Sequence, residues 1–262
     1  MSKTIGRIVV LFLVLAALSA CSRATPTPAP EFTCDTPGTI QNLTLEETSR
    51  GYSYSYALYL PPCYETMPER SYPVLYLLPG RGSGPRTWFG AGAGDVADEL
   101  ILSGEVPPFI ITSTETTNDD MYAEAITKDL VPYIESHYRV SPDRRHHAVA
   151  GGSLGGVAAY RIVFRDPAHF SSAGMFGSGA ISGEEKPIKA WLDAIPSENP
   201  VRVFFNCGEG DPLMLDQARV MMAMLDEAGI PHTEIVSDGA HVYAYWVSNM
   251  PDYFRWLAQD WE

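Results

Sequence analysis

The sequence predicts an α/β protein built on a mostly parallel, doubly wound sheet, with an antiparallel hairpin on its N-terminal side. Residues 52–60 alternate polar with aromatic or apolar side chains, which is typical of an antiparallel strand with one buried face. Short apolar runs follow at residues 74–78, 109–111, 148–150 and 201–205, as expected for strands covered on both faces. Helical patterns lie between these runs. This alternation predicts a parallel sheet with right-handed crossovers.

The hairpin is expected from residues 39–47 and 52–60, which flank a turn at residues 49–51. Cys34 and Cys63 are almost equally far from this turn along the chain, so they should lie close together across the hairpin. We predict a disulfide between them, which an oxidising compartment would favour.

Helices are expected at residues 119–138, 154–164 and 216–228, where apolar side chains recur with a helical period. Pro132 interrupts the first of them and could kink it. Gly229 is expected to end the third.

The N-terminal segment has the pattern of a signal peptide. Lys3 and Arg7 precede an apolar run at residues 8–18, which is short of the roughly 20 residues that a transmembrane helix needs. The run ends in Leu-Ser-Ala-Cys, which resembles the bacterial lipobox, where the cysteine, here Cys21, is acylated and becomes the mature N-terminus. Ordinary cleavage nearby is the alternative.

A spacer rich in threonine and proline follows this cysteine. Residues 22–30 read SRATPTPAP, a composition that stays extended and packs no core. We therefore expect a lipoprotein signal peptide at residues 1–20, a lipidated cysteine and linker at residues 21–36, and one folded domain at residues 37–262. This organisation predicts an exported bacterial lipoprotein that is anchored to a membrane through Cys21. It does not say which membrane.

Composition bounds the choice of partners. The chain has 262 residues, of which 45% are hydrophobic, enough for one sizeable core. Its formal net charge is −14, and clustered Lys and Arg are absent, which argues against a nucleic-acid partner. An acidic surface kept for solubility explains the same charge. The oligomeric state stays open.

A glycine-rich turn at residues 151–156, GGSLGG, contains the pattern G-x-S-x-G between a strand and an amphipathic helix. Such a tight turn forces Ser153 into strained backbone angles, while Gly151 and Gly155 leave room for the neighbouring strand and helix. The serine hydroxyl would then project above the sheet. A glycine-rich turn without chemistry is the alternative for this motif alone, and Ser153 is the candidate nucleophile.

A serine hydroxyl needs a histidine base, and that base needs a carboxylate to orient it. Asp211 lies in the loop NCGEGD directly after the strand at residues 201–205, and His241 lies before a tryptophan-rich terminal helix. The order serine, acid, histidine is the one this turn motif requires. Glu209 and Asp238 are the competing acids.

The other histidines and the third cysteine of the domain are expected to be structural. His232 begins a strand and is expected at the surface. Cys207 is expected to be a buried free thiol, because nothing near it in the sequence would stabilise a thiolate. The histidines expected in structural roles are His137, His146, His147 and His169.

Backbone amides are the expected oxyanion donors. The amide of Leu154 begins the helix after the nucleophile, and the second donor should come from the loop after the strand at residues 74–78, which reads PGRGSG. We assign it to Arg81, with Gly82 as the fallback. A flexible glycine loop without this contact is the alternative.

At this point the chain resembles the putative-esterase branch of the α/β-hydrolases, which includes feruloyl and acetylxylan esterases, S-formylglutathione hydrolases, enterochelin esterases and mycolyltransferases. The matching segments are YPVLYLLPGRGSG, DLVPYIESHYRVSPDRRHHAVAGGSLGGVAAY, FNCGEGD and GAHVYAYW, which span residues 72–246. The resemblance implies an α/β-hydrolase fold with the same nucleophile, acid, base and amide donors. Two positions depart from many members of the family: Pro79-Gly80 stands where many have His-Gly, and Leu154 stands where many have methionine.

The resemblance implies a serine carboxylester hydrolase that forms an acyl-enzyme and needs no metal or organic cofactor. It suggests carbohydrate-linked feruloyl or acetyl esters as substrates, with siderophore ester hydrolysis, acyl transfer and non-catalytic binding as alternatives. Trp88, Phe89 and Trp246 are candidates for the substrate pocket, and core or rim packing explains them equally well. The glycine-rich loop at residues 80–94 is either an ordered wall or a mobile lid.

Overall fold

The computed structural model describes residues 34–46, 48–49, 51–116 and 122–261. The predicted signal peptide, Cys21 and residues 22–33 of the predicted linker lie outside the described residues. Within the described part of the chain the strands form an eight-stranded sheet in the order β1-β2-β4-β3-β5-β6-β7-β8. The strands are β1 (Thr39–Leu45), β2 (Tyr54–Leu60), β3 (Val74–Leu78), β4 (Ile110–Thr114), β5 (His147–Gly152), β6 (Ser172–Phe176), β7 (Arg202–Gly208) and β8 (His232–Ser237).

The predicted hairpin is confirmed. β1 and β2 pair antiparallel with Thr39 opposite Leu60, and β2 continues the sheet antiparallel to β4. Both strands stop short of the predicted turn. Beyond the end of β1, Ser49 contacts the segment before α4: its N–H donates a hydrogen bond to the Asp129 carboxylate at 2.7 Å.

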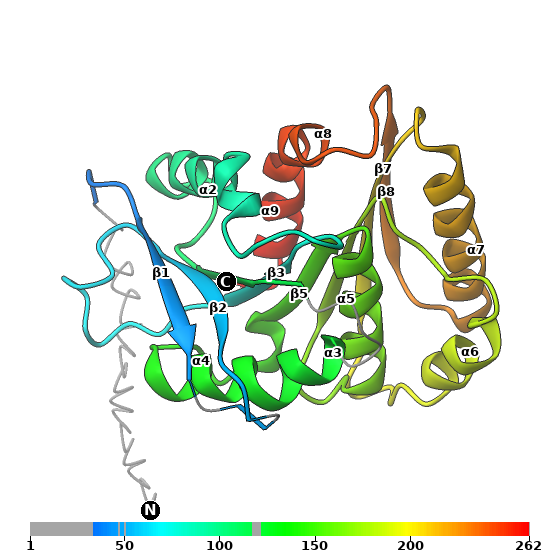
Figure 1. The fold of residues 1–262 in the computed structure, drawn as a ribbon, viewed down its shortest axis with the longest axis horizontal. Coiled ribbons are helices and arrows are strands. Elements are labelled where there is room, and N and C mark those ends of the chain that lie inside the picture. The colour runs from blue at the N-terminus through cyan, green and yellow to red at the C-terminus, as the bar shows by residue number, and fades with distance from the viewer. Residues whose placement is uncertain (1–33, 47, 50, 117–121, 262) are drawn as a thin grey trace, which may run out of the picture. The chain divides into compact units, whose positions relative to one another are not determined.

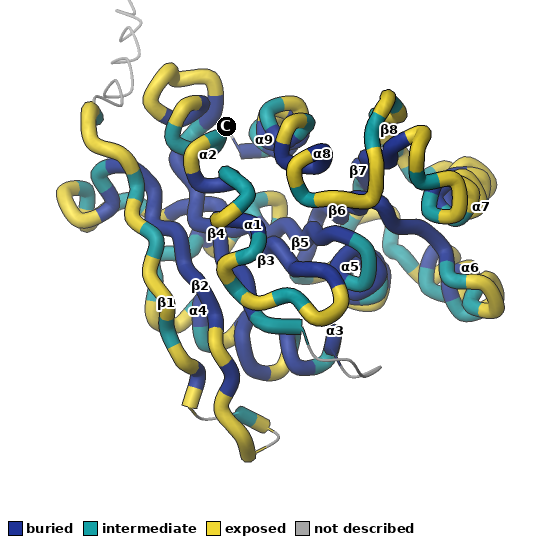
Figure 2. The backbone as a smooth tube through the Cα atoms, turned by 45° about the horizontal axis from the view of Figure 1, so that its top comes forward, coloured by how far each residue is buried: buried dark blue, intermediate teal, exposed yellow. Residues whose placement is uncertain are grey.

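From β4 onward every strand pair is parallel, which confirms the doubly wound sheet. Both faces of the central strands are covered, as β7 illustrates: Val203 and Phe205 join the core on one face, whereas the Phe204 ring packs against Tyr253 at 5.1 Å on the other. Figure 2 shows buried backbone along the centre of the sheet and exposed residues along β1 at its edge.

Helices cover the two faces of the sheet (Figure 1), with α2, α8 and α9 gathered on one side and α3, α4 and α5 on the other. Their bounds are α1 (Thr87–Gly90), α2 (Ala93–Leu102), α3 (Tyr122–Ala125), η1 (Ile126–Leu130), α4 (Val131–His137), η2 (Arg144–His146), α5 (Leu154–Arg165), α6 (Glu185–Asp193), α7 (Pro212–Ala228), α8 (Tyr243–Ser248) and α9 (Met250–Ala258). None of the described helices is long and apolar enough to cross a membrane.

Two expected helices are interrupted, each beside a proline. The helix predicted at residues 119–138 is divided into α3, the π-helical turn η1 and α4, and its first residues lie outside the described part. Pro132 has no N–H to donate, and the Val131 N–H before it reaches back five residues to the Ile126 carbonyl. The terminal helix likewise divides at Asn249, with Pro251 in the first turn of α9.

The predicted disulfide is present. Cys34 and Cys63 are bonded with a Cα–Cα distance of 6.0 Å and a sequence separation of 29 residues. The bond ties the segment before β1 to the residues after β2. It therefore fixes the open end of the edge hairpin, where hydrogen bonds from a further strand are not available.

Replacing Cys34 and Cys63 together by alanine should lower the free energy of unfolding by about 3 kcal/mol, because the bond restrains the unfolded chain over this loop. Urea unfolding followed by tryptophan fluorescence measures the change. Wild-type protein kept reduced is the matched control and should unfold like the double variant. Equal stability of the oxidised wild type and the double variant would contradict the prediction.

Candidate functional site

Ser153 lies at the turn between β5 and α5 and has a positive φ of 53°. This conformation is uncommon for a residue with a Cβ and stores strain. The Ser153 N–H donates to the Phe176 carbonyl at 2.8 Å, which fixes the turn against the end of β6. The Ser153 residue is half-buried, so its hydroxyl remains open to a substrate.

The glycines around Ser153 permit the turn to lie against β3. A Cβ on Gly155 would lie 2.2 Å from the Leu78 carbonyl oxygen, and one on Gly151 would lie 2.4 Å from the Gly155 backbone. No side chain fits in either place. The prediction that these glycines leave room for the neighbouring strand and helix is confirmed.

Asp211 and His241 are brought together by two loops at the same edge of the sheet. Asp211 follows β7 and immediately precedes α7, and His241 follows β8. His241 Nδ1 lies 2.5 Å from Asp211 Oδ2, and the side chains are 38% and 13% exposed. Because a carboxylate accepts, Nδ1 carries the proton, and the Nε2 lone pair is left available as a base.

The competing acids do not take this position. Glu209 and Asp238 are exposed, and within the described part of the chain neither side chain contacts His241. His232 does not lie at the Asp211–His241 pair. Its Nδ1 is 3.9 Å from Asp226 Oδ1, and its side chain is 18% exposed.

The serine turn and His241 both lie against the end of β6. The residue after Phe176 is Gly177, and a Cβ there would lie 2.9 Å from His241 Nδ1 and 2.7 Å from the Trp246 ring. The Trp246 ring also contacts the edge of His241 at 4.9 Å between centroids. A Cβ on Gly152 would lie 2.5 Å from this ring, so Trp246 packs against both His241 and the residue before Ser153.

The three aromatic residues that were candidates for the substrate pocket are buried. Trp88, Phe89 and Trp246 are 0%, 6% and 2% exposed. The Trp88 indole N–H donates to the Leu78 carbonyl at 3.0 Å, and its ring lies 5.8 Å from that of Trp246. They offer a substrate almost no surface, which corresponds to the packing alternative.

Tyr243 is a residue of this site that the sequence analysis did not identify. Its hydroxyl accepts from the Gly80 N–H at 2.6 Å and donates to Ser83 Oγ at 3.1 Å. The Thr116 hydroxyl donates to the Gly80 carbonyl at 2.6 Å from the other side. Its place two residues after the candidate base was the only sequence signal, because the contact joins residues 163 positions apart.

The candidate oxyanion amides are unoccupied by protein acceptors. Gly80 spends its N–H on Tyr243, whereas the N–H groups of Arg81 and Leu154 have no acceptor among the residues that the structure describes. Both follow directly on residues held in place, Gly80 and Ser153. Free amides beside a half-buried serine are what an oxyanion site requires.

Cys207 is a free, buried cysteine, as predicted. Burial raises the pKa of its thiol to about 11, and the nearby Asp211 carboxylate acts in the same direction. A thiol with this pKa is almost entirely protonated at neutral pH and is not a competing nucleophile.

The geometry agrees with comparisons to known proteins. The sequence profile of a family described as "Putative esterase" matches residues 48–257. The chain belongs to this putative esterase family. The match supports carboxylic ester hydrolysis as the activity class, and it includes Ser153, Asp211 and His241.

Similar proteins include esterases of several kinds. An endo-1,4-β-xylanase/feruloyl esterase of Xylanibacter ruminicola is 28% identical over 228 residues, 80% of this chain and 30% of that protein's length. A solved ferulic acid esterase has a TM-score of 0.76 at 24% identity and covers 87% of this chain and 100% of its own. An S-formylglutathione hydrolase of Staphylococcus aureus has a TM-score of 0.70 at 16% identity and covers 86% of this chain and 99% of its own.

These likenesses confirm the α/β-hydrolase fold of the esterase. The chain spans less than a third of the length of the xylanase/feruloyl esterase relative.

Tyr243→Phe should lower kcat for ester hydrolysis about tenfold and leave KM nearly unchanged, because the Gly80 amide loses its acceptor and the loop that carries the candidate Arg81 donor is no longer fixed. Steady-state hydrolysis of p-nitrophenyl acetate measures both constants. Tyr160→Phe is the control, since it loses a hydroxyl bond to Glu184 at 2.7 Å elsewhere in the fold. Wild-type kcat in Tyr243→Phe would contradict this positioning role.

Proposed function

We propose that the chain is a serine carboxylester hydrolase in which Ser153 is the nucleophile, His241 the general base and Asp211 the acid that orients it. The hydrogen bond of 2.5 Å between Asp211 and His241 carries this proposal. It sets the imidazole tautomer and stabilises the cation that forms when the base takes up a proton. The strained conformation of Ser153 supports the same assignment.

The reaction has two steps. The Ser153 oxygen attacks the ester carbonyl while His241 removes its proton, and His241 then gives that proton to the departing alcohol. Water then attacks the acyl carbonyl while His241 takes its proton, and the bond to Ser153 breaks, which releases the carboxylic acid as His241 returns the proton to the Ser153 oxygen. The amides of Arg81 and Leu154 would stabilise the negative oxygen in both steps, each by about 3 to 4 kcal/mol.

The proposed substrates are carbohydrate-linked feruloyl or acetyl esters. A relative and a solved neighbour named as feruloyl or ferulic acid esterases support this class. Two exposed apolar side chains beside the acid and the base support an aromatic acyl group: Leu213, which is 65% exposed, and Val242, which is 49% exposed. The sequence analysis did not single out either residue.

We also propose that the enzyme is exported and anchored as a lipoprotein through Cys21. The apolar run at residues 8–18, the following Leu-Ser-Ala-Cys and the Thr/Pro-rich composition of residues 22–30 support this location. A tether would hold the domain near a surface while its substrate remains a polymer outside the cell.

Ser153→Ala should abolish hydrolysis of p-nitrophenyl acetate and methyl ferulate without lowering the melting temperature. Asp211→Asn should reduce kcat by about 10³ to 10⁴, because the tautomer of His241 is no longer fixed. Chromogenic assays and liquid chromatography of released ferulate measure these changes.

The matched controls are Ser182→Ala, in the exposed loop before α6, and Glu209→Gln, two residues before the proposed acid. Both should retain nearly full activity. Turnover by Ser153→Ala, or a larger loss in Glu209→Gln than in Asp211→Asn, would overturn the assignment. Cleavage of acetate without ferulate would retain the mechanism and exclude the feruloyl class.

Cys21→Ala should release the protein from membranes when the full chain is expressed in a bacterium. Radiolabelled palmitate should enter the wild-type protein and not the variant, because acylation requires the thiol. Cys207→Ala is the control for loss of a cysteine elsewhere. Equal labelling of wild type and Cys21→Ala would exclude the anchor.

A further inference from the structure

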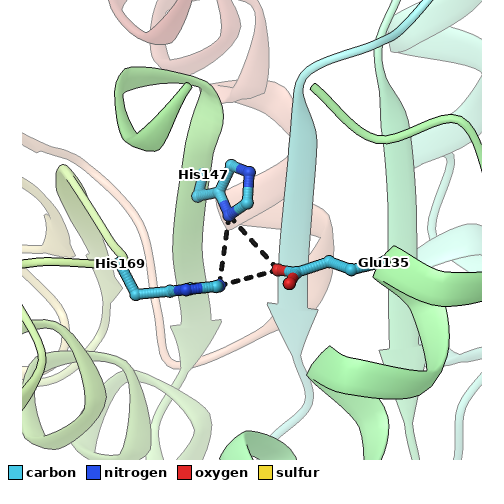
Figure 3. A group of neighbouring side chains, drawn as sticks. All are labelled: Glu135, His147 and His169. Carbon is cyan, nitrogen blue, oxygen red and sulfur yellow. Dashed lines mark hydrogen bonds and ion pairs between the residues drawn. The ribbon is translucent and has the colours of Figure 1, made fainter. Parts of the chain in front are cut away.

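Three side chains from separate elements converge at the opposite end of β5 from Ser153 (Figure 3): Glu135 of α4, His147 at the start of β5, and His169 between α5 and β6. His169 Nε2 lies 2.7 Å from Glu135 Oε1 and 3.2 Å from His147 Nδ1. His147 Nδ1 lies 3.2 Å from the same carboxylate oxygen. Both histidines were predicted from the sequence to be structural, and no role was predicted for Glu135.

No arrangement of protons places a hydrogen bond on all three of these close contacts. His147 Nε2 must carry a proton, because its partner at 2.6 Å is the Ser141 carbonyl, which can only accept. A neutral His147 then directs a lone pair from Nδ1 at Glu135 Oε1, and the single proton on His169 Nε2 serves two acceptors. If both rings are protonated, two cationic nitrogens face each other at 3.2 Å, with His147 only 6% exposed.

A metal ion would satisfy all three lone pairs at once. Ligand atoms about 2.0 to 2.2 Å from a tetrahedral zinc ion lie roughly 3.3 to 3.5 Å from one another. The two separations of 3.2 Å that involve His147 are already close to this value, whereas His169 Nε2 and Glu135 Oε1, at 2.7 Å, would have to move apart by about 0.6 to 0.8 Å. On binding, zinc takes the place of the shared proton, which leaves to solvent.

We propose that Glu135, His147 and His169 form a zinc site. Two imidazoles and one carboxylate, without a thiolate, suit zinc and related first-row divalent ions better than calcium or magnesium. The outer contacts are those of a metal site: His147 donates its other N–H to the Ser141 carbonyl, and the Tyr76 hydroxyl donates to Glu135 Oε1 at 3.3 Å. His169 and Glu135 are 33% and 25% exposed, so a water molecule can complete the coordination.

The site acts on stability and not on the reacting atoms. β5 separates its ligand His147 from Ser153, a span of roughly 20 Å along the strand. A zinc ion there would link α4, the start of β5 and the segment before β6. These elements surround the amino end of β5, so the ion would raise the melting temperature without altering catalysis.

The test uses the full chain purified without a histidine tag, freed of metal with a chelator and then dialysed against zinc chloride. We expect about one zinc per chain by elemental analysis, a rise in melting temperature of about 5 °C, and a visible absorption band when cobalt replaces zinc. His169→Ala and Glu135→Gln should each lose the bound metal, the cobalt band and the rise in melting temperature. Circular dichroism confirms that both variants fold.

Two control variants separate this site from other histidines. His137→Ala removes an exposed histidine of α4, and His241→Ala removes the histidine beside Asp211. Both should bind zinc as the wild type does. Absence of stoichiometric zinc in the wild type, or unchanged binding in His169→Ala, would overturn the proposal and leave an ion pair.

Discussion

The close contact between the Ser153 turn and the end of β3 is the constraint on which the site depends. Gly155 lies so close to Leu78 that a Cβ would be 2.2 Å from its carbonyl oxygen, and one on Gly151 would be 2.6 Å from the same atom. This approach strains Ser153 and also brings the loop after β3, with the Arg81 amide, beside the serine. A larger residue at either glycine would separate the nucleophile turn from the loop that carries the proposed oxyanion donor.

A set of aromatic contacts connects this part of the fold to His241. The Trp88 ring lies 4.8 Å from Tyr243 and 5.8 Å from Trp246, and Trp246 in turn contacts His241. These aromatic rings are packed between the end of the sheet and α8, where they exclude water from beneath the site. Tyr243 at the start of α8 also accepts from Gly80. The short helix α8 therefore fixes the loop after β3 through Tyr243 and packs against His241 through Trp246.

The sequence predicts what local patterns encode. Ser153, Asp211 and His241 each follow a recognisable strand in a known order, and the disulfide follows from two cysteines placed evenly about a turn. β6 was missed because its residues, SAGMF, lack the branched side chains that indicate a strand, and Gly174 is needed where Tyr253 and Ala150 approach. Tyr243 and the burial of Trp88 depend on contacts across the fold, which no local pattern contains.

The two ends of β5 carry different proposed sites, the nucleophile at one end and the zinc ligands at the other. At its carboxyl end, the strained Ser153 and the backbone amides without an acceptor lower the stability of the fold, and these amides are the proposed donors to the reacting oxygen. At its amino end, His147 is fixed by the Ser141 carbonyl and faces Glu135 and His169, where a bound ion would return stability to the same strand. Both ends belong to the same strand. An ion bound at the amino end of β5 would therefore stabilise the fold and offset the cost of the strained Ser153, without contacting the reacting atoms. This separation is why changes at the ligand cluster should alter unfolding and leave turnover intact.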